Sequence, residues 1–231
     1  HGDAVAIVVA RDELTAEKAA LLVNVEWEAL PVITRPEDAL AADAVAIHEA
    51  GNCLRSSEIM AGDPLKAIAQ ADHQVGGHFQ TPVIQHCHME GVTSFAWMEE
   101  DARITIVSST QIPHIVRRVV AQALDIAWSR IRVIKPYVGG GFGNKQDVLE
   151  EPMAAFLTLK LGGIPVKVML SREECFTATR TRHAFTIDGK LGISRDGILK
   201  AYMLDVLSNT GAYASHGHSI AAAGGNKIPY L

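Results

Sequence analysis

The sequence is poor in the residues that mark several common protein classes. Its 231 residues include only three cysteines, which are widely spaced and form no CxxC pair. This argues against a disulfide framework, a zinc site made of cysteines, and an iron–sulfur cluster held by this chain. The apolar runs, such as residues 4–10, are much shorter than the roughly 20 residues that a transmembrane helix requires. No secretory signal is visible either, so we expect a cytoplasmic protein without a membrane partner.

An excess of basic residues is also absent. The chain has 21 Lys and Arg against 26 Asp and Glu, which gives a formal net charge of -5. Nucleic-acid-binding domains usually carry a basic patch, so we expect no nucleic-acid partner. The apolar content of 48% is enough for a sizeable core and excludes a disordered chain. Because the first residue is His rather than Met, we expect a piece of a longer protein.

The hydrophobic patterns predict an α+β fold of mixed sheets and helices. Helix signals include Asp63-Pro64 as an N-cap and first helical residue, and an apolar stripe after Pro113. An Asp-Gly pair at 196–197 predicts a hairpin turn. We expect strands at 3–10, 23–27, 75–81, 92–97, 103–109, 131–138 and 166–170, two more within 185–205, and helices at 13–22, 63–71, from 113, and at 152–161. The stripe of the helix from 113 comprises Val116, Val119, Val120, Ala123 and Leu124.

Four glycines in five residues, at 139–143, follow the strand predicted at 131–138. Glycine is favoured where the backbone needs a positive φ or must approach another group closely, and successive N–H groups before a helix can cradle an anion. The loop is not a Walker motif, because Gln146 follows Lys145, and it is not a dinucleotide fingerprint, because position 144 is Asn. A ligand-binding loop and a tight strand-to-helix connection therefore both remain open.

Other polar groups are weaker candidates. His86, His88 and Glu90 alternate, so on a strand they would share one face and could bind a divalent metal, as in a hydrolase. A solvated or hydrogen-bonded strand edge is the interpretation that we favour for them. The adjacent pairs at 150–151 and 173–174 stand where helices begin, where carboxylates complement the helix dipole.

Five segments, taken in order, resemble the molybdenum-binding subunit of the xanthine dehydrogenase family. They are Ser109-Thr110-Gln111-x-Pro113-His114-x-Val116-Arg117-Arg118, Val138-Gly139-Gly140-Gly141-Phe142-Gly143-Asn144-Lys145, Leu170-Ser171-Arg172-Glu173-Glu174, Thr181-Arg182-His183 and Asn209-Thr210-Gly211-Ala212-Tyr213. The resemblance implies the α+β fold of a molybdopterin-binding domain. It further implies that residues 1–35 are the C-terminal end of a small preceding, hammerhead-like domain. Residues 36–61 would be a connector, and residues 62–231 would form the first, incomplete part of the molybdopterin-binding domain.

The same resemblance implies a molybdenum hydroxylase that oxidises a purine or related N-heterocycle of the xanthine or hypoxanthine type, with water as the oxygen source. Its cofactor would be a molybdenum-pterin, either molybdopterin or its dinucleotide. Electrons would leave through iron–sulfur clusters and FAD on partner subunits. The alternative that we keep is a binding module without redox chemistry, whose glycine loop holds a phosphate-bearing ligand.

The resemblance also assigns site residues. Gln111 would lie beside the apical oxygen of molybdenum. Phe142 and Gly143 would lie beside the metal, with the Gly143 backbone N–H placed like the Gln111 amide and the Phe142 ring walling the substrate. Gly140 and Gly141 would contact the cofactor. Gln146 stands where purine hydroxylases often carry a glutamate, so a neutral amide would face the substrate there. Two family features have no counterpart in this sequence: no arginine follows Arg195, and the general base belongs to later segments.

Overall fold

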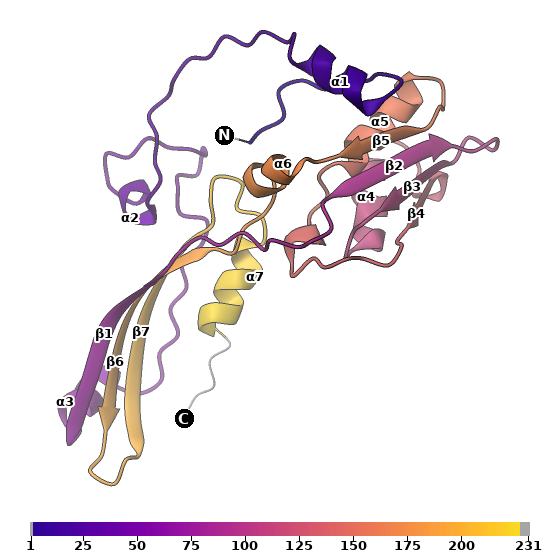
Figure 1. The fold of residues 1–231 in the computed structure, drawn as a ribbon. Coiled ribbons are helices and arrows are strands. Elements are labelled where there is room, and N and C mark those ends of the chain that lie inside the picture. Colours follow the sequence, from indigo (N-terminus) through magenta and orange to yellow (C-terminus); the bar gives the residue numbers. More distant parts are fainter. Residues whose placement is uncertain (1, 227–231) are drawn as a thin grey trace. The chain divides into compact units, whose positions relative to one another are not determined.

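The computed structural model describes residues 2–226, which form two compact units (Figure 1). The first unit combines the residues up to Trp27 with Gln85–Thr181. The second unit combines Glu28–Ile84 with the residues from Arg182 onward. Each unit is therefore built from two separate parts of the chain. The sequence-based division at residues 35 and 61 concerns family domains and stays a prediction.

A four-stranded mixed sheet organises the first unit, in the order β4-β3-β2-β5. Its strands are β2 (Thr93–Met98), β3 (Ile104–Ser108), β4 (Ile131–Ile134) and β5 (Val166–Met169). Strand β3 pairs in parallel with β4, and β2 pairs antiparallel with both β3 and β5. Parallel neighbours need a crossover connection, and helix α4 (Pro113–Ala123) supplies it between β3 and β4.

Helices α4 and α5 (Glu151–Lys160) pack against this sheet and against each other to form the core (Figure 1). The buried core residues are Ala96, Ile104, Ile106, Val116, Val120, Ala121, Ile131, Ala154 and Ala155. Of the stripe predicted on α4, Val116 and Val120 are fully buried, whereas Ala123 is exposed and Ala121 takes its place in the core. The apolar face is thus predicted correctly in its first two turns and lies slightly rotated in the last.

The remaining helices of the first unit begin at capping residues. In α1 (Glu13–Ala20) the Asp12 side chain accepts the amide of Thr15, and α6 (Arg172–Thr177) begins with a capping box between Ser171 and Glu174. Short 3₁₀ turns lie at Trp128–Arg130 and Asn144–Gln146. The strands predicted at 3–10 and 23–27 are wrong: within the described residues these segments pair with no other strand, and extended backbone without a ladder partner is not a strand.

The second unit is a three-stranded antiparallel sheet in the order β1-β6-β7. Its strands are β1 (His73–Thr81), β6 (Ala184–Ile193) and β7 (Leu199–Asn209), and the predicted turn with Gly197 at φ 85° joins the last two. Short helices accompany them: α2 (Pro36–Ala39), α3 (Pro64–Ala69) and α7 (Gly217–Ala221), which runs into a π turn at Ala222–Asn226. Asp63 caps α3 as predicted. In Figure 1, α3 lies beside one end of this sheet.

The α+β class predicted from the sequence is confirmed by these two sheets and their helices. The strand expected over 131–138 ends four residues early, because Pro136 has no N–H to donate to a ladder. Among the described residues, no helix has the length and apolar character needed to cross a membrane.

Candidate functional site

The glycine loop lies in the first unit, between β4 and the 3₁₀ turn at Asn144–Gln146. Three of its residues have left-handed backbone: Gly140 at φ 94°, Phe142 at φ 53° and Gly143 at φ 97°. Glycine adopts this region at little cost, but a residue with a side chain does not. Phe142 is thus held in an unfavourable conformation that leaves 74% of its surface exposed. Backbone strain of this kind is often found at binding and catalytic sites.

The amides of the loop divide into bonded and unbonded groups. Gly139 donates to Glu90 Oε2, Gly143 donates to Gln111 Oε1 at 3.1 Å, and the backbone N–H of Asn144 donates to Gly141 O at 2.9 Å. Within the part of the chain that the structure describes, the three consecutive amides at 140–142 donate to no acceptor. Such a run of N–H groups can receive an anionic or oxygen-rich ligand.

Gln111 reaches the loop from the segment between β3 and α4. Its backbone N–H donates to Lys145 O at 2.8 Å, which fixes the segment beside the loop. A Cβ on Gly141 would lie 2.5 Å from Gln111 Oε1, so a side chain at that position would displace the Gln111 amide. The structure therefore brings together the predicted site residues Gln111, Gly140, Gly141, Phe142 and Gly143 in one place.

Glu90 closes the glycine loop at both ends. The same carboxylate oxygen, Oε2, accepts the Gly139 amide and the Lys145 ammonium, the latter at 3.0 Å. The side chain of Lys145 is only 1% exposed, whereas that of Glu90 is 35% exposed. Sequence reasoning missed this pair, because 55 residues separate the two partners and no local pattern links them.

The metal site considered for His86, His88 and Glu90 is absent. These residues do not lie on a strand, so the alternation that would place them on one face does not apply. Among the described residues, no three His, Cys, Asp or Glu side chains are grouped as metal ligands. His86 instead borders the loop, with its Nε2 3.7 Å from the position of a Cβ on Gly143, and burial lowers the pKa of its imidazole.

Asn144 and Arg180 hold the downstream end of the loop. The side-chain amide of Asn144 is buried and donates to Gln85 Oε1, Thr179 Oγ1 and Arg180 O at 2.8–2.9 Å. The Arg180 guanidinium pairs with both carboxylate oxygens of Asp147. Position 144, where a dinucleotide fingerprint would have glycine, therefore carries a side chain that ties the loop to residues 179–180.

Gln146, the predicted substrate-facing residue, lies at the end of this anchored segment. Its side chain is half-buried. Its backbone amide donates to Gly143 O at 3.2 Å. The chain thus brings position 146 next to Gly143, although its role toward a substrate stays a prediction.

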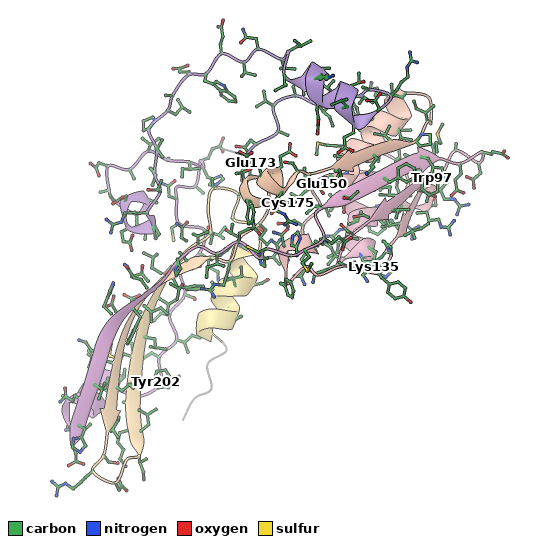
Figure 2. The ribbon with its side chains drawn as sticks, viewed as in Figure 1. Trp97, Lys135, Glu150, Glu173, Cys175 and Tyr202 are labelled. Carbon is green, nitrogen blue, oxygen red and sulfur yellow. The ribbon has the colours of Figure 1, made fainter. Side chains whose placement is uncertain are left out.

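A small cavity of about 10 Å³ is lined in part by Asn144, Lys145, Glu150 and Glu151. Both glutamates are buried where α5 begins. Glu150 lies near α6 (Figure 2), where Glu174 contributes to its electrostatic surroundings. Glu151 accepts hydrogen bonds from Ser108 Oγ at 2.6 Å and from the Leu149 amide at 3.1 Å. Burial, together with the charge of Glu151, raises the pKa of Glu150 to about 8. The two glutamates stand at the start of a helix as predicted, but both are buried in the interior.

Comparison with protein families supports a cofactor-binding role for this region. The family model of the molybdopterin cofactor-binding domain matches residues 47–230. The chain is 78% identical over 231 residues to the xanthine dehydrogenase molybdenum-binding subunit of Escherichia coli O157:H7, covering 100% of this chain and 31% of that protein. It is 34% identical to the nicotinate dehydrogenase large molybdopterin subunit of Eubacterium barkeri, covering 95% of this chain and 52% of that one.

Solved structures agree with this assignment. Quinoline 2-oxidoreductase from Pseudomonas putida 86 superposes with a TM-score of 0.82 at 30% identity, over 88% of this chain and 26% of that one. Aldehyde oxidoreductase from Desulfovibrio gigas superposes with a TM-score of 0.81 at 26% identity, over 86% of this chain and 22% of that one. The chain spans about a third of the length of the xanthine dehydrogenase subunit that it matches. It belongs to the molybdopterin cofactor-binding domain family, which includes the molybdenum-binding subunits of xanthine dehydrogenase-type hydroxylases.

Proposed function

We propose that the chain forms part of the catalytic subunit of a molybdenum hydroxylase that oxidises a purine or related N-heterocycle, with water as the oxygen source. The observation that carries the proposal is the run of unbonded amides at 140–142 beside Gln111. The substrate class is supported by the 78% identity to a xanthine dehydrogenase subunit. Similar proteins named for nicotinate and quinoline, which are also N-heterocycles, point the same way.

The residues present fit a molybdenum-pterin group. The amides at 140–142 can donate to oxygen atoms of the group, and the absence of a Cβ on Gly141 lets the Gln111 amide lie against this loop. When bound, that group supplies the two-electron redox chemistry, while the protein supplies position and electrostatics. Gln111 Oε1 already accepts from Gly143, so the Nε2 of the same amide is the atom left to donate toward an oxygen of the cofactor.

Phe142 and Gln146 would orient the substrate. The exposed ring of Phe142 offers a flat apolar wall against which a heteroaromatic ring can stack. The neutral amide of Gln146 can both donate to and accept from ring nitrogens. The general base and most of the pterin contacts would come from parts of the enzyme outside this chain.

Electron transfer would require partner subunits that carry iron–sulfur clusters and FAD. The three cysteines of this chain are free thiols, and Cys175 is buried while the other two are exposed. A [2Fe–2S] or [4Fe–4S] cluster takes four thiolates, so this chain could not hold one by itself. The cytoplasmic location likewise stays a prediction.

The test is to purify the full-length subunit together with its partner subunits. We expect molybdenum and a pterin in the preparation, turnover of xanthine or hypoxanthine, and incorporation of labelled oxygen from water into the product. A preparation that is fully folded but lacks molybdenum, or that takes the oxygen from O₂, would contradict the proposal. The alternative of a phosphate-binding module without redox chemistry is not supported by the family assignment.

A further inference from the structure

The Arg180 side chain bonds to the last residue of the glycine loop and to two residues that follow it. This side chain is 6% exposed. Nε donates to Asp147 Oδ2 at 2.8 Å, and NH2 pairs with the other carboxylate oxygen. NH1 donates to Gly143 O at 3.3 Å, and NH2 also donates to Gln146 O at 3.5 Å. One planar group therefore contacts Gly143, Gln146 and Asp147 at once.

The geometry separates two anchors of the loop. Glu90 holds Gly139 and Lys145, which lie on either side of the unbonded amides. Arg180 holds the backbone carbonyls of Gly143 and Gln146, the second of which belongs to the residue that would face the substrate. Loss of the Glu90 anchor and loss of the Arg180 anchor should therefore affect different parts of the site.

A buried ion pair is in itself weak evidence for stability, because desolvation offsets most of the attraction between the charges. The Arg180–Asp147 pair is better explained by geometry. A guanidinium has five N–H donors in a fixed plane, so it can orient several acceptors at once, whereas an ammonium cannot. The acceptors named above lie on residues 143–147.

We propose that Arg180 is a positioning residue which, paired with Asp147, fixes the Gly143–Gln146 segment and thereby sets how tightly the substrate binds. The inference rests on the proposed function, since it assumes that Gln146 faces a heterocyclic substrate. Arg180 itself acts through the loop and touches no reacting atom.

The test uses the full-length holoenzyme with Arg180→Lys, which keeps the charge and loses the planar fork. We expect unchanged molybdenum content, a KM for xanthine about tenfold higher, and a kcat within about threefold of wild type, since a lost ground-state contact raises KM. Hydrogen exchange of the Asn144 and Gln146 amides, which donate to Gly141 O and Gly143 O, should accelerate about tenfold. Arg103→Lys is the matched control, because Arg103 pairs with Asp101 on the surface of the same unit.

Asp147→Asn provides a second variant in case Arg180→Lys loosens the whole unit. It should raise KM and accelerate the same two amides, with the rest of the protein unchanged. Wild-type KM and wild-type exchange in both variants would overturn the proposal, and so would loss of molybdenum with an unchanged KM. If the wild-type enzyme holds no molybdenum, the proposed function fails by itself, and unchanged exchange in the variants would then separately overturn the role of Arg180.

Discussion

Glu90 Oε2 lies 3.0 Å from Lys145 Nζ, and the same oxygen accepts the amide hydrogen of Gly139. A single carboxylate therefore joins the two ends of a loop whose middle amides stay unbonded. Lys145 is 1% exposed, and Glu90 is the carboxylate that pairs with its ammonium directly, while Glu150 lies near enough for the charge of Lys145 to lower its pKa. The relationship makes Glu90 a residue of the loop, although it lies far from it in the sequence.

Replacing Glu90 with Gln should destabilise the protein by about 2 kcal/mol. Breaking a fully buried ion pair costs about 3–5 kcal/mol, and the partial exposure of Glu90 reduces that figure. The free energy of unfolding in urea measures the loss. The double variant with Lys145→Met should recover part of it, because no uncompensated charge remains. Wild-type stability in Glu90→Gln alone would show that the pair does not compensate Lys145.

Replacing Gln111 with Ala should lower turnover of the assembled enzyme about 100-fold, because the variant loses the hydrogen-bond donor that we propose for the cofactor. Stability should fall by only about 1 kcal/mol, since the variant leaves one half-buried amide, that of Gly143, without its acceptor. Steady-state kinetics and thermal unfolding measure the two effects. Gln122→Ala, on the exposed side of α4, is the control. Full activity in Gln111→Ala would contradict the assigned role.

Valine substitutions at Gly143 and Gly162 separate the backbone strain of a substitution from its effect on cofactor binding. Both have positive φ, at 97° and 75°, so valine at either position should cost about 1–3 kcal/mol. A Cβ on Gly162 meets nothing within 4 Å, whereas one on Gly143 would project beside His86 at the loop. Only Gly143→Val should lower the molybdenum content per subunit. Equal molybdenum content in the two variants would count against cofactor contact at Gly143.

The protein should become less stable as the pH rises, because of Glu150. Its pKa is about 8 when folded and near 4.5 otherwise, so between these values the unfolded chain releases a proton that the folded protein retains. The free energy of unfolding therefore decreases across this window, by at most about 1.4 kcal/mol per pH unit, and levels off above it.

Glu150→Gln removes this titration. The difference in Tm between the variant and the wild type should grow from about pH 4.5 to about pH 8 and then stay constant. Glu173→Gln, at an exposed position in the first turn of α6, should show no such trend. A difference that is flat across the window would mean that Glu150 is ionised in the folded protein.

Much of the fold follows from local signals. Asp63-Pro64 places the start of α3, the Asp-Gly pair places the β6–β7 turn, and Val116 and Val120 identify the buried face of α4. The segments at 3–10 and 23–27 have strand-like composition, but strand formation depends on a partner that local sequence does not specify. The glycine run and Gln111 could be found from motif order. Glu90 and Arg180 could not, since each contacts the loop from a distant segment.

The left-handed backbone of Phe142 has a consequence for anyone engineering this protein. Glycine at this position would relieve the conformational penalty and should raise the melting temperature. The same change would delete the exposed ring that is proposed to stack on the substrate. Selecting variants for heat resistance alone would thus favour loss of the ring that we propose to face the substrate, so thermal screens of this protein need a turnover assay beside them.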